Sequence, residues 1–352
     1  MACGFGILRV EVVEISLKGE GYHFRTITPN SHARILDRLS TRLAPEDPTE
    51  RLRWFFGWNV GVGSSIAKNW LKSSTLKKMQ SSSNKWKVER RSFKATQTFK
   101  SKIRFSTHGD LIWAHSSFPT TESDCIFFGP DTYRYFYFLQ KVVDVYLSSC
   151  PSEEFKLIDI GAGSGAGGLF IAEEIRKKHA TARTHVTLTD INPRALQFCR
   201  ANAAVNYRGE KIDYQISDIL KQVNESFDLI LSNPPYMVDL EDSKSAASKE
   251  GQARMYRNGG GTLGIDLSLR IISEGAEKLK SGGLIALYTG IPILEMGIDP
   301  FLQAFTPLVS KGDMEVLKYE EIDPDVWGEE LETRSYSNVE RIAVMGLVLR
   351  KK

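Results

Sequence analysis

The 352-residue sequence has few cysteines, and they are scattered, without a CxxC pair or a neighbouring histidine: Cys3, Cys125, Cys150 and Cys199. A disulfide framework or a structural zinc site is therefore not expected, and this usage is typical of a reducing compartment. No run of 18 or more apolar residues occurs, and the N-terminus lacks the charged-then-apolar pattern of a signal peptide. We therefore expect a cytoplasmic protein with no membrane partner.

The sequence also lacks a strong net charge. Its formal charge is +3 at pH 7, and its 41% hydrophobic and 25% charged residues are ordinary for a globular protein. Basic residues nevertheless gather between Lys68 and Arg104, where Glu89 is the only acid. This pattern predicts a basic arm or face. Such a face could contact RNA or another phosphate-rich surface, or it could simply be exposed to solvent.

The first 126 residues predict a mixed region. Residues 1–30 show no clear pattern, and we expect them to be poorly ordered. Apolar residues at helical spacing predict a helix over Ser31–Leu43, and a second helical segment is expected over Thr49–Phe56. After a serine- and lysine-rich linker over Ser73–Asn84, polar and aromatic residues alternate over Trp86–Phe118, which predicts a small antiparallel sheet that turns at residues 108–110.

From about Asp131 onward, apolar strands alternate with helix-length segments. This alternation predicts an α/β fold, a seven-stranded, mostly parallel, doubly wound sheet covered on both faces, after a smaller N-terminal α+β region. We expect helices over Ala166–Lys178, Pro193–Asn206 and Asp266–Lys280. The strand candidates are KLIDIGAG, HVTLTD, IDYQISD, FDLILSN, GLIALYTG, MEVLKYEEI and RIAVMGLVLR. The predicted regions are 1–85 (helical and variable), 86–126 (small basic β region) and 127–352 (α/β domain).

A glycine-rich turn follows the first of these strands. The sequence LIDIGAGSGAGG, Leu157–Gly168, places a strand, a turn and a helix start in succession, and glycine lets backbone N–H groups approach a ligand at the positive end of the helix. Asp190 ends the next strand, where a carboxylate can accept both hydroxyls of an adenosine ribose. Asp218 follows the third strand and can accept the adenine amine. NAD and S-adenosylmethionine both contain adenosine, so these residues leave both cofactors open.

The stretch LSNPPYM, Leu231–Met237, follows the fourth strand. Methyl transfer to an amide or exocyclic amine nitrogen requires that the planar nitrogen become pyramidal. Two acceptors aimed at its N–H hydrogens favour that geometry: the side-chain oxygen of Asn233 and the carbonyl of Pro234. The paired prolines hold this carbonyl rigidly, because proline fixes its own φ and restricts the residue before it. Tyr236 offers a flat face on which the acceptor group can stack.

With these motifs in order, the chain resembles the class I S-adenosylmethionine-dependent methyltransferases of the Asn-Pro-Pro-Tyr group, and among them the release-factor glutamine N5-methyltransferases. The resemblance covers roughly residues 127–349 and rests on FFGPDTYRY, DIGAGSG, TDINPRAL, SDIL and SNPPYM. It implies a Rossmann-like methyltransferase fold, S-adenosyl-L-methionine as cofactor, a protein glutamine as acceptor, and a release factor or another translation protein as partner. Phe128-Gly129 and Tyr133 depart from the family's Pro-Arg and Glu.

The resemblance assigns roles by position. Asn233, Pro234 and Tyr236 would hold the acceptor nitrogen. Asp190 would bind the ribose and Asp218 the adenine, whereas Asp159 would orient the glycine loop or the cofactor's amino group. The full set of residues that it assigns to the cofactor is Asp159, Gly161, Gly163, Gly165, Asp190, Asp218, Asn233 and Thr132.

Two other functions compete with this interpretation. An amino-methyltransferase that acts on adenine or guanine in RNA or DNA would use the same acceptor motif, and the basic stretch favours it. An NAD-dependent oxidoreductase would use the glycine loop but leaves Asn-Pro-Pro-Tyr unexplained. His108 and His115 lack metal-ligand spacing, so no metal site is predicted. We expect Val238–Ile265 to be a lid over the acceptor site, and the acidic, aromatic loop Asp323–Leu331 has no predicted role.

Overall fold

A computed structural model describes residues 8–63, 66, 98–120, 122–149, 154–208, 211–238 and 257–352. The chain divides into two compact units. The first comprises Met1–Thr121, Ile126–Tyr133 and Gln197–Tyr207, and the second comprises Glu122–Cys125, Arg134–Leu196 and Arg208–Lys352. The predicted region boundaries at residues 85 and 126 stay predictions.

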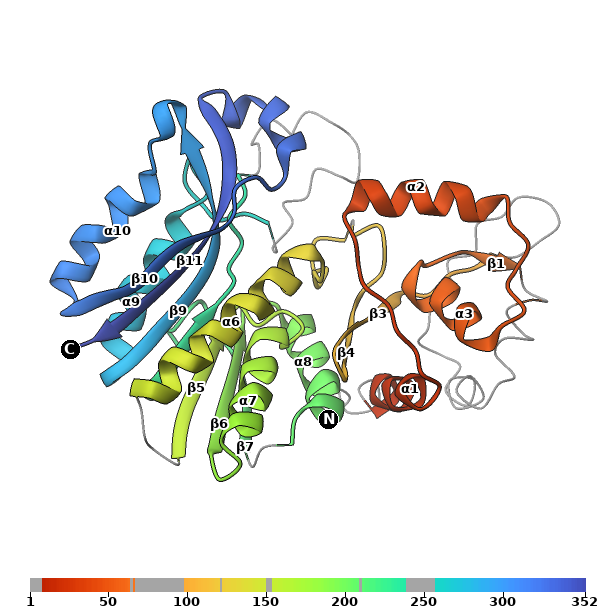
Figure 1. The fold of residues 1–352 in the computed structure, drawn as a ribbon, viewed down its shortest axis with the longest axis horizontal. Helices are drawn as coiled ribbons and strands as arrows, with labels where there is room; N and C mark the ends of the chain where they lie inside the picture. Colours follow the sequence, from red (N-terminus) through yellow and green to blue (C-terminus); the bar gives the residue numbers. More distant parts are fainter. Residues whose placement is uncertain are drawn as a thin grey trace. The chain divides into compact units, whose positions relative to one another are not determined.

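The second unit is built on a seven-stranded sheet with the order β10-β11-β9-β8-β5-β6-β7 (Figure 1). β7, β6, β5, β8 and β9 run parallel, and β11 pairs antiparallel with both β9 and β10. The predicted seven-stranded, mostly parallel sheet is therefore confirmed. The strands are β5 (Glu154–Ile160), β6 (Arg183–Asp190), β7 (Lys211–Ile216), β8 (Phe227–Ser232), β9 (Leu279–Leu294), β10 (Met314–Asp323) and β11 (Val339–Lys351).

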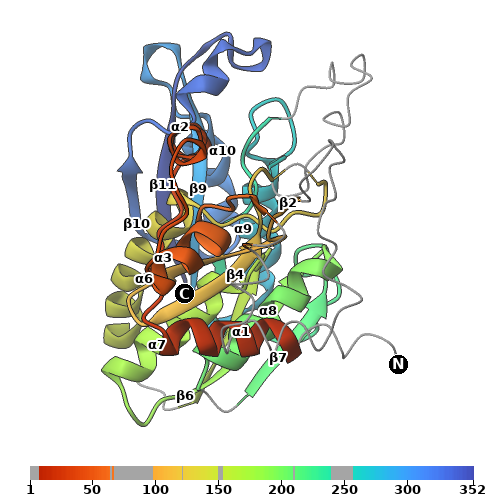
Figure 2. The same cartoon turned by 90° about the vertical axis from the view of Figure 1, so that its right-hand side faces the viewer.

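Helices cover both faces of this sheet, as Figures 1 and 2 show. On one face, Phe136 of α6 packs on Phe170 of α7, with their ring centroids 4.4 Å apart. On the other face, Phe301 and Phe305 of α10 join the buried Ile271 and Ile272 of α9 in one apolar cluster. The helices are α6 (Pro130–Ser149), α7 (Ala166–Lys178), α8 (Pro193–Asn206), α9 (Asp266–Lys278) and α10 (Pro300–Lys311).

Two of the three helices predicted in this region have the expected bounds, and the third ends earlier. α7 and α8 match the predictions, whereas α9 ends at Lys278 instead of Lys280. The reason is that Leu279 is buried and already pairs with Phe227 in the sheet. Tertiary pairing therefore overrides the helical pattern at this end.

The first unit contains a helix that the sequence analysis missed. We expected residues 1–30 to be poorly ordered, but α1 (Leu8–Gly19) forms and buries Val13 and Leu17 completely. The following extended segment buries Phe24, whose backbone N–H donates to Thr107 Oγ1 at 3.1 Å. The expectation was wrong for the described part of this segment, because its order comes from partners that are distant in sequence.

The other predicted elements of the first unit form with shifted ends. α2 (Pro29–Ser40) begins where the side chain of Thr28 caps it and ends before Leu43, which is 94% exposed. α3 (Pro48–Leu52) continues into a π-helical turn over Arg53–Gly57. The strands of this unit are β1 (Val62–Gly63), β2 (Thr98–Phe99), β3 (Ile103–His108) and β4 (Leu111–Ser116). β3 and β4 form the predicted antiparallel pair, with Gly109 in the turn at φ +55°.

The basic stretch is only partly described. Lys68–Lys94 and the predicted linker lie outside the described residues, as do residues 239–256 of the predicted lid. Arg104 is not on a surface, since it is 4% exposed and donates from Nε to Gly57 O at 2.9 Å. Burial lowers the pKa of Arg104 to about 10. The prediction of a basic face is therefore wrong for this residue, which belongs to the core of the first unit.

Candidate active site

The loops that carry the predicted motifs leave the sheet in one row. Ile160, the last residue of β5, pairs with Ser232 of β8 on one side and with Thr189 of β6 on the other. Neighbouring strands lie about 4.8 Å apart, so the glycine loop starts beside both Asn233 and Asp190. β5 and β8 are also where the strand order reverses, and open α/β sheets bind ligands at such a point, outside the carboxyl ends of the strands.

The glycine loop has the backbone that a cofactor cradle requires. Gly161, Gly163 and Gly165 have φ values of +67°, +57° and +77°, which L side chains rarely adopt. A Cβ at Gly161 or Gly163 would meet no atom within 4 Å, so the space beside these two residues is open. Gly165 is the N-cap of α7 and no side chain caps this helix, which leaves its positive end to a ligand.

Asp190 ties the end of β6 to this loop. Its Oδ2 accepts from the N–H of Gly163 at 2.9 Å, and its Oδ1 accepts from the N–H of Asn192 at 2.8 Å. Burial raises the pKa of Asp190, and the backbone hydrogen bonds from Asn192 and Gly163 oppose that rise. Each carboxylate oxygen keeps further lone-pair capacity. Asp190 therefore shapes the loop, and its contact with a ribose stays a prediction.

Asp159 lies beneath the loop beside an unpartnered hydroxyl. Its Oδ2 accepts from the N–H of Gly168 at 2.7 Å, and burial raises its pKa to about 7. Tyr135 Oη is fully buried and makes no hydrogen bond in the described part of the chain. A Cβ on Gly167 would lie 3.0 Å from both Tyr135 Oη and Asp159 Oδ2. Within the described ranges this buried carboxyl has no counter-ion. Together with the orphaned hydroxyl it fits a cationic ammonium group, which the methionine part of S-adenosylmethionine would supply.

Asp218 is more exposed than its predicted role suggests. Its Oδ2 pairs with Lys221 Nζ at 2.5 Å and its Oδ1 with Arg270 at 3.2 Å. The hydrogen bond from Lys221 is the main cause that lowers the pKa of Asp218. The residue does follow β7, in the same row of loops, so its place agrees with the prediction, but an adenine amine would share this carboxylate with two cations.

Thr132 has a local structural contact. It lies in the first turn of α6, where its Oγ1 accepts from the N–H of Gly129 at 3.2 Å and its own N–H donates to Gly129 O at 3.0 Å. Its side chain is buried, and it belongs to the first unit. Its predicted contact with the cofactor stays a prediction.

The acceptor motif presents two hydrogen-bond acceptors. The half-buried side-chain amide of Asn233 makes no hydrogen bond with any residue that the structure describes, and no described donor is aimed at the carbonyl of Pro234. Both residues follow β8 directly, beside the glycine loop. An unpaired amide at this depth is costly unless a ligand or water completes it, so these groups fit the acceptor clamp predicted for them.

Tyr236 is held tightly in place. It is 7% exposed, and a Cβ on Gly290 of β9 would lie 2.2 Å from its Cδ2 and Cε2, so glycine is required where its ring packs. Its hydroxyl accepts from Trp327 Nε1 at 2.9 Å. One side of the ring is thus covered by β9, and only the remaining side can face an acceptor group.

Sequence reasoning missed three aromatic residues of this site. Tyr135 was not singled out, Trp327 lay in a loop without a predicted role, and Tyr336 Oη accepts from the N–H of Val238 at 2.9 Å just after the acceptor motif. Their contacts join segments up to about a hundred residues apart. A glycine at 167 beside the loop was the one sequence signal for a close neighbour such as Tyr135.

Comparison with known proteins agrees with this arrangement. Residues 140–265 match the family model described as the methyltransferase small domain, a segment that includes the glycine loop and the acceptor motif. The mostly parallel seven-stranded sheet around this domain has the predicted Rossmann-like organisation.

The chain is also similar to proteins named release factor glutamine methyltransferase. The chain is 31% identical to that of Koribacter versatilis over 160 residues, which is 44% of this chain and 54% of the relative. It is 34% identical to that of Borreliella burgdorferi over 133 residues, which is 38% of this chain and 43% of the relative. The chain therefore spans about half the length of the curated relatives it matches, and the resemblance seen in the motifs is confirmed.

A solved structure is similar over a larger share of the chain at lower identity. The tRNA m1G37 methyltransferase of M. jannaschii is 15% identical, with a TM-score of 0.43, over 73% of this chain and 60% of that one. A likeness this distant carries no information on the substrate.

The described ranges contain neither a metal-binding cluster nor a helix that could span a membrane. No group of three or more His, Cys, Asp or Glu side chains is placed there to share a metal ion. Of the helices that the structure describes, none has both the length and the apolar character to cross a bilayer.

Proposed function

We propose that this protein transfers the methyl group of S-adenosyl-L-methionine to the side-chain amide nitrogen of a protein glutamine. The observation that carries the proposal is that the amide of Asn233 and the carbonyl of Pro234, beside the glycine loop, have no hydrogen-bond partner among the described residues. The similarity to release factor glutamine methyltransferases supports the choice of acceptor and makes a release factor or another translation protein the expected partner.

The protein's own groups account for the acceptor side of the reaction. When bound, S-adenosyl-L-methionine supplies an electrophilic methyl group on its sulfonium. Asn233 Oδ1 and the Pro234 carbonyl accept from the two N–H hydrogens of the glutamine, which favours a pyramidal nitrogen whose lone pair is free to attack. The new N–C bond forms as the S–C bond breaks, and the nitrogen then releases one proton to solvent. No strong general base is required, because the methylated nitrogen is acidic while it carries the positive charge.

The cofactor side rests on the loops around β5 and β6. The glycine loop offers an open cradle at the positive end of α7, and Asp190, which accepts from Gly163 of this loop, would bind the ribose. Asp159 with Tyr135 suits the cofactor's ammonium group, and Asp218 is the candidate for the adenine. Thr132 remains a candidate by position in the motif.

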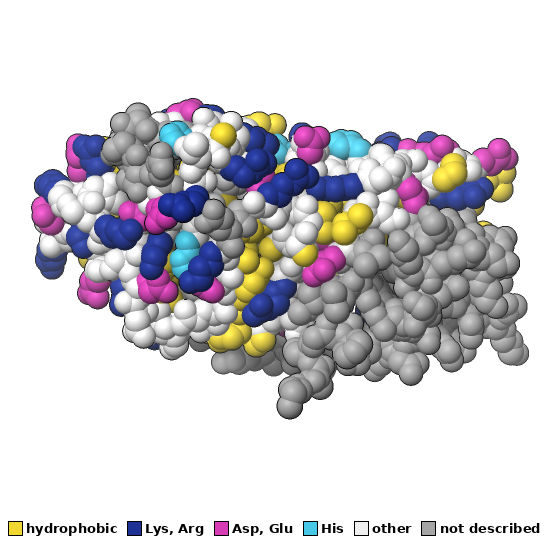
Figure 3. All heavy atoms as spheres, turned by 90° about the horizontal axis from the view of Figure 1, so that it is seen from below, with side chains coloured by type: hydrophobic (Ala, Val, Ile, Leu, Met, Phe, Trp, Pro, Cys, Tyr) yellow, Lys and Arg dark blue, Asp and Glu magenta, His cyan; other side chains and the backbone are white. Residues whose placement is uncertain are grey.

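An RNA or DNA base is the competing acceptor, and it would use the same two oxygens. The described part of the face in Figure 3 shows both basic and acidic side chains, with several Lys and Arg side chains close together across its middle. Among the described residues, ion pairs offset part of the positive charge, such as those of Lys156 with Glu225 and Arg183 with Glu154. Nucleic-acid binding requires an accumulation of positive charge. Most of the basic stretch between Lys68 and Arg104 lies outside the described residues, so the similarity to release factor glutamine methyltransferases is what favours the amide acceptor.

The test is methyl transfer from labelled S-adenosyl-L-methionine to glutamine-containing protein, RNA and DNA, each in fractionated cell extract and then with the purified acceptor. Label in a glutamine side chain supports the proposal. Label in nucleic acid, or no transfer to any acceptor despite cofactor binding, contradicts it.

Two variants separate the acceptor site from the cofactor site. We expect Asn233→Ala to lower kcat by at least about a hundredfold, since the acceptor loses one of two positioned hydrogen-bond partners, while the Kd for S-adenosylhomocysteine changes less than twofold. Asp190→Ala should mainly raise the Kd for S-adenosylhomocysteine, because it removes the hydrogen bond that the N–H of Gly163 donates to this carboxylate. Calorimetry measures the Kd for S-adenosylhomocysteine, and initial rates measure kcat. An equal loss of cofactor affinity in the two variants would contradict the assigned roles.

A further inference from the structure

The segment between β10 and β11, residues 324–338, is fixed to the sheet at its start. The N–H of Val326 donates to Ile342 O at 2.8 Å, and Arg341 donates to the carbonyl of Pro324 at 2.8 Å. Two 3₁₀ turns follow, Gly328–Glu332 and Arg334–Tyr336. We call residues 324–338 the β10–β11 segment, and its place relative to the sheet is therefore set by backbone and side-chain contacts.

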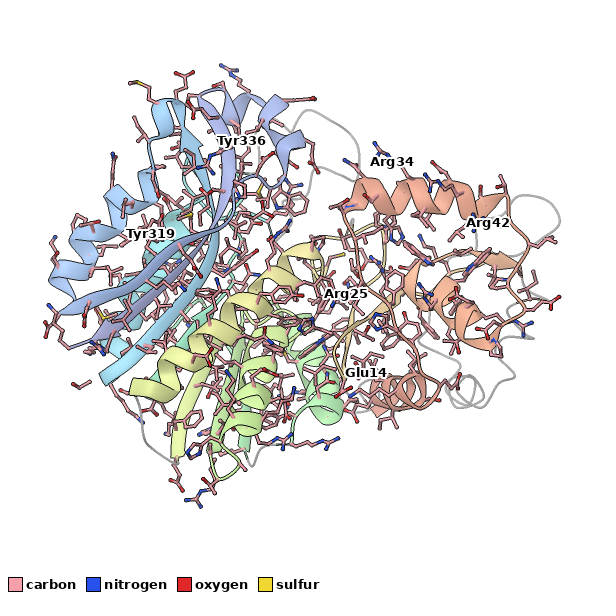
Figure 4. All side chains as sticks on the ribbon, in the orientation of Figure 1. Glu14, Arg25, Arg34, Arg42, Tyr319 and Tyr336 are labelled. Atoms are coloured by element: carbon pink, nitrogen blue, oxygen red, sulfur yellow. The ribbon has the colours of Figure 1, made fainter. Side chains whose placement is uncertain are left out.

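This segment contacts residues 233–238, the acceptor motif and the residue after it, which we call the acceptor loop. Trp327 Nε1 donates to Tyr236 Oη at 2.9 Å, and Tyr336 Oη, labelled in Figure 4, accepts from the N–H of Val238 at 2.9 Å. Glu330 forms an ion pair with Arg257 at 2.9 Å. The segment thus holds the acceptor loop both at the aromatic ring and at the backbone that follows it.

Trp327 has a backbone conformation that non-glycine residues avoid. Its φ is 57° and its ψ is 35°, in the left-handed region, which is unfavourable for an L-residue. Such strain persists only where surrounding contacts impose it, and it concentrates at functional sites. Here the conformation goes together with an indole N–H that reaches the hydroxyl of Tyr236.

The hydrogen bond fixes the direction of the Tyr236 hydroxyl. An indole N–H can only donate, so Tyr236 Oη is the acceptor in this bond. The ring is confined from another side by Gly290, where a Cβ would lie 2.2 Å from Cδ2 and Cε2. The Tyr236 backbone is confined as well, because a Cβ on Gly264 would lie 2.2 Å from its carbonyl oxygen. Ring and backbone are thus set by glycine packing, and the hydroxyl is set by Trp327.

We propose that Trp327 is a positioning residue for methyl transfer, which acts by fixing the Tyr236 ring beside Asn233 so that the acceptor amide is held in the attacking geometry. The proposal rests on the proposed function and extends it to the β10–β11 segment. Its effect reaches the acceptor through Tyr236 and leaves the cofactor side unchanged.

The central test is a double-mutant cycle with Trp327→Phe and Tyr236→Phe, in the full-length protein with a glutamine-containing acceptor. Trp327→Phe keeps an aromatic ring and removes the N–H. We expect it to lower kcat by about fivefold to tenfold, the size of one buried hydrogen bond, with the Kd for S-adenosylhomocysteine within twofold of wild type. In the Tyr236→Phe background, Trp327→Phe should lower kcat by less than twofold.

A matched control lies in the same unit. Tyr319 lies on β10, apart from Tyr336 in Figure 4. Tyr319→Phe removes the hydrogen bond from its hydroxyl to Asp299 and should leave kcat and KM unchanged. Equal losses from Trp327→Phe in both backgrounds, or full activity of Trp327→Phe, would overturn the proposal. So would a loss of cofactor affinity that matches the loss of kcat.

A spectroscopic measurement separates this proposal from the proposed function. The indole N–H resonance of Trp327, assigned by its disappearance in Trp327→Phe, should move on Tyr236→Phe because the hydrogen bond is lost. An unmoved resonance overturns the positioning contact whatever the enzyme does. A wild-type protein that transfers no methyl group, with the resonance shift present, overturns the function and with it the catalytic role of Trp327.

Discussion

At the residue scale, Asp159 is a buried carboxyl beside the glycine loop with a strongly raised pKa. Its carboxyl is 2% exposed, and its pKa rises to about 7, mainly through burial. The charge of Asp190 adds to this rise, and the N–H of Gly168 opposes it. A cation bound at this carboxyl would favour its ionised form, so the raised pKa describes a site that a positively charged ligand would complete.

This pKa predicts a pH dependence of stability. Folded Asp159 keeps its proton up to about pH 7, whereas the unfolded chain loses it near 3.8, so unfolding in that window releases a proton. Stability therefore falls as pH rises from about 4 to about 7, by at most about 1.4 kcal/mol per pH unit. Asp159→Asn keeps an oxygen for Gly168 and does not titrate, so its free energy of unfolding should lack this fall.

Denaturant titrations of wild type and Asp159→Asn at pH 5, 6 and 7 measure the difference directly. The variant should gain stability relative to wild type with each step up in pH. Asp325→Asn, at an exposed carboxyl, is the control. A constant difference between wild type and Asp159→Asn over this range would contradict the burial of an uncompensated charge.

At the element scale, the turn from β5 into α7 depends on how closely other elements approach it. Gly167, in the first turn of α7, would place a Cβ 2.6 Å from Tyr135 Cε1 of α6 and 3.0 Å from Asp159 Oδ2. Alanine normally favours a helix over glycine, but here its methyl group would push α6 away from the loop. Packing between elements therefore outweighs helix propensity at this position.

Gly167→Ala is accordingly expected to weaken cofactor binding. The displaced Tyr135 and Asp159 would raise the Kd for S-adenosylmethionine by about tenfold or more, and overpacking of this kind costs about 1–3 kcal/mol of stability. Calorimetry and thermal melting give the two quantities. Gly19→Ala, where a Cβ would meet nothing within 4 Å, serves as the control, and a Gly167→Ala protein with wild-type affinity would remove Tyr135 from the cofactor site.

At the scale of the whole molecule, the first unit draws on residues far along the chain. Asn202 and Asn206, in the second half of α8, face the edge of β4. Asn202 accepts from the N–H of Ala114 at 2.8 Å and donates to its carbonyl at 3.1 Å, and Asn206 makes the same pair of bonds with Ile112. Two amides one helical turn apart thus replace a neighbouring strand.

Loss of these amides should destabilise the protein strongly. Asn202→Ala leaves a buried N–H and a buried carbonyl of Ala114 with fewer partners, at a cost of about 1–3 kcal/mol, and Asn206→Ala should act similarly. Melting temperature and denaturant midpoint measure the loss, with Asn338→Ala at an exposed position as the control. Variants of Asn202 and Asn206 that melt like the control would show that water satisfies β4 as well as α8 does.

The sequence predicted the local elements of the second unit well, and for a local reason. Strands such as FDLILS are buried on both faces and therefore read as continuous apolar runs. The start of α8 is also local, because the side chain of Asn192 accepts from the N–H of Arg194. The first 30 residues could not be predicted in this way, because α1 and Phe24 are ordered by contacts with β3 and β4 about ninety residues away.

The candidate site divides along the same line. The sequence by itself determined which residues follow each strand, because a glycine turn, a strand-end carboxylate and Asn-Pro-Pro-Tyr are contiguous chemical signals. Only the tertiary structure decided that Asp159 is buried beside Tyr135, that Asp218 pairs with two cations, and that Trp327 holds Tyr236. Burial and side-chain partners depend on which distant segments the fold brings together. The periodicity and spacing of residues along the chain do not determine which segments these are.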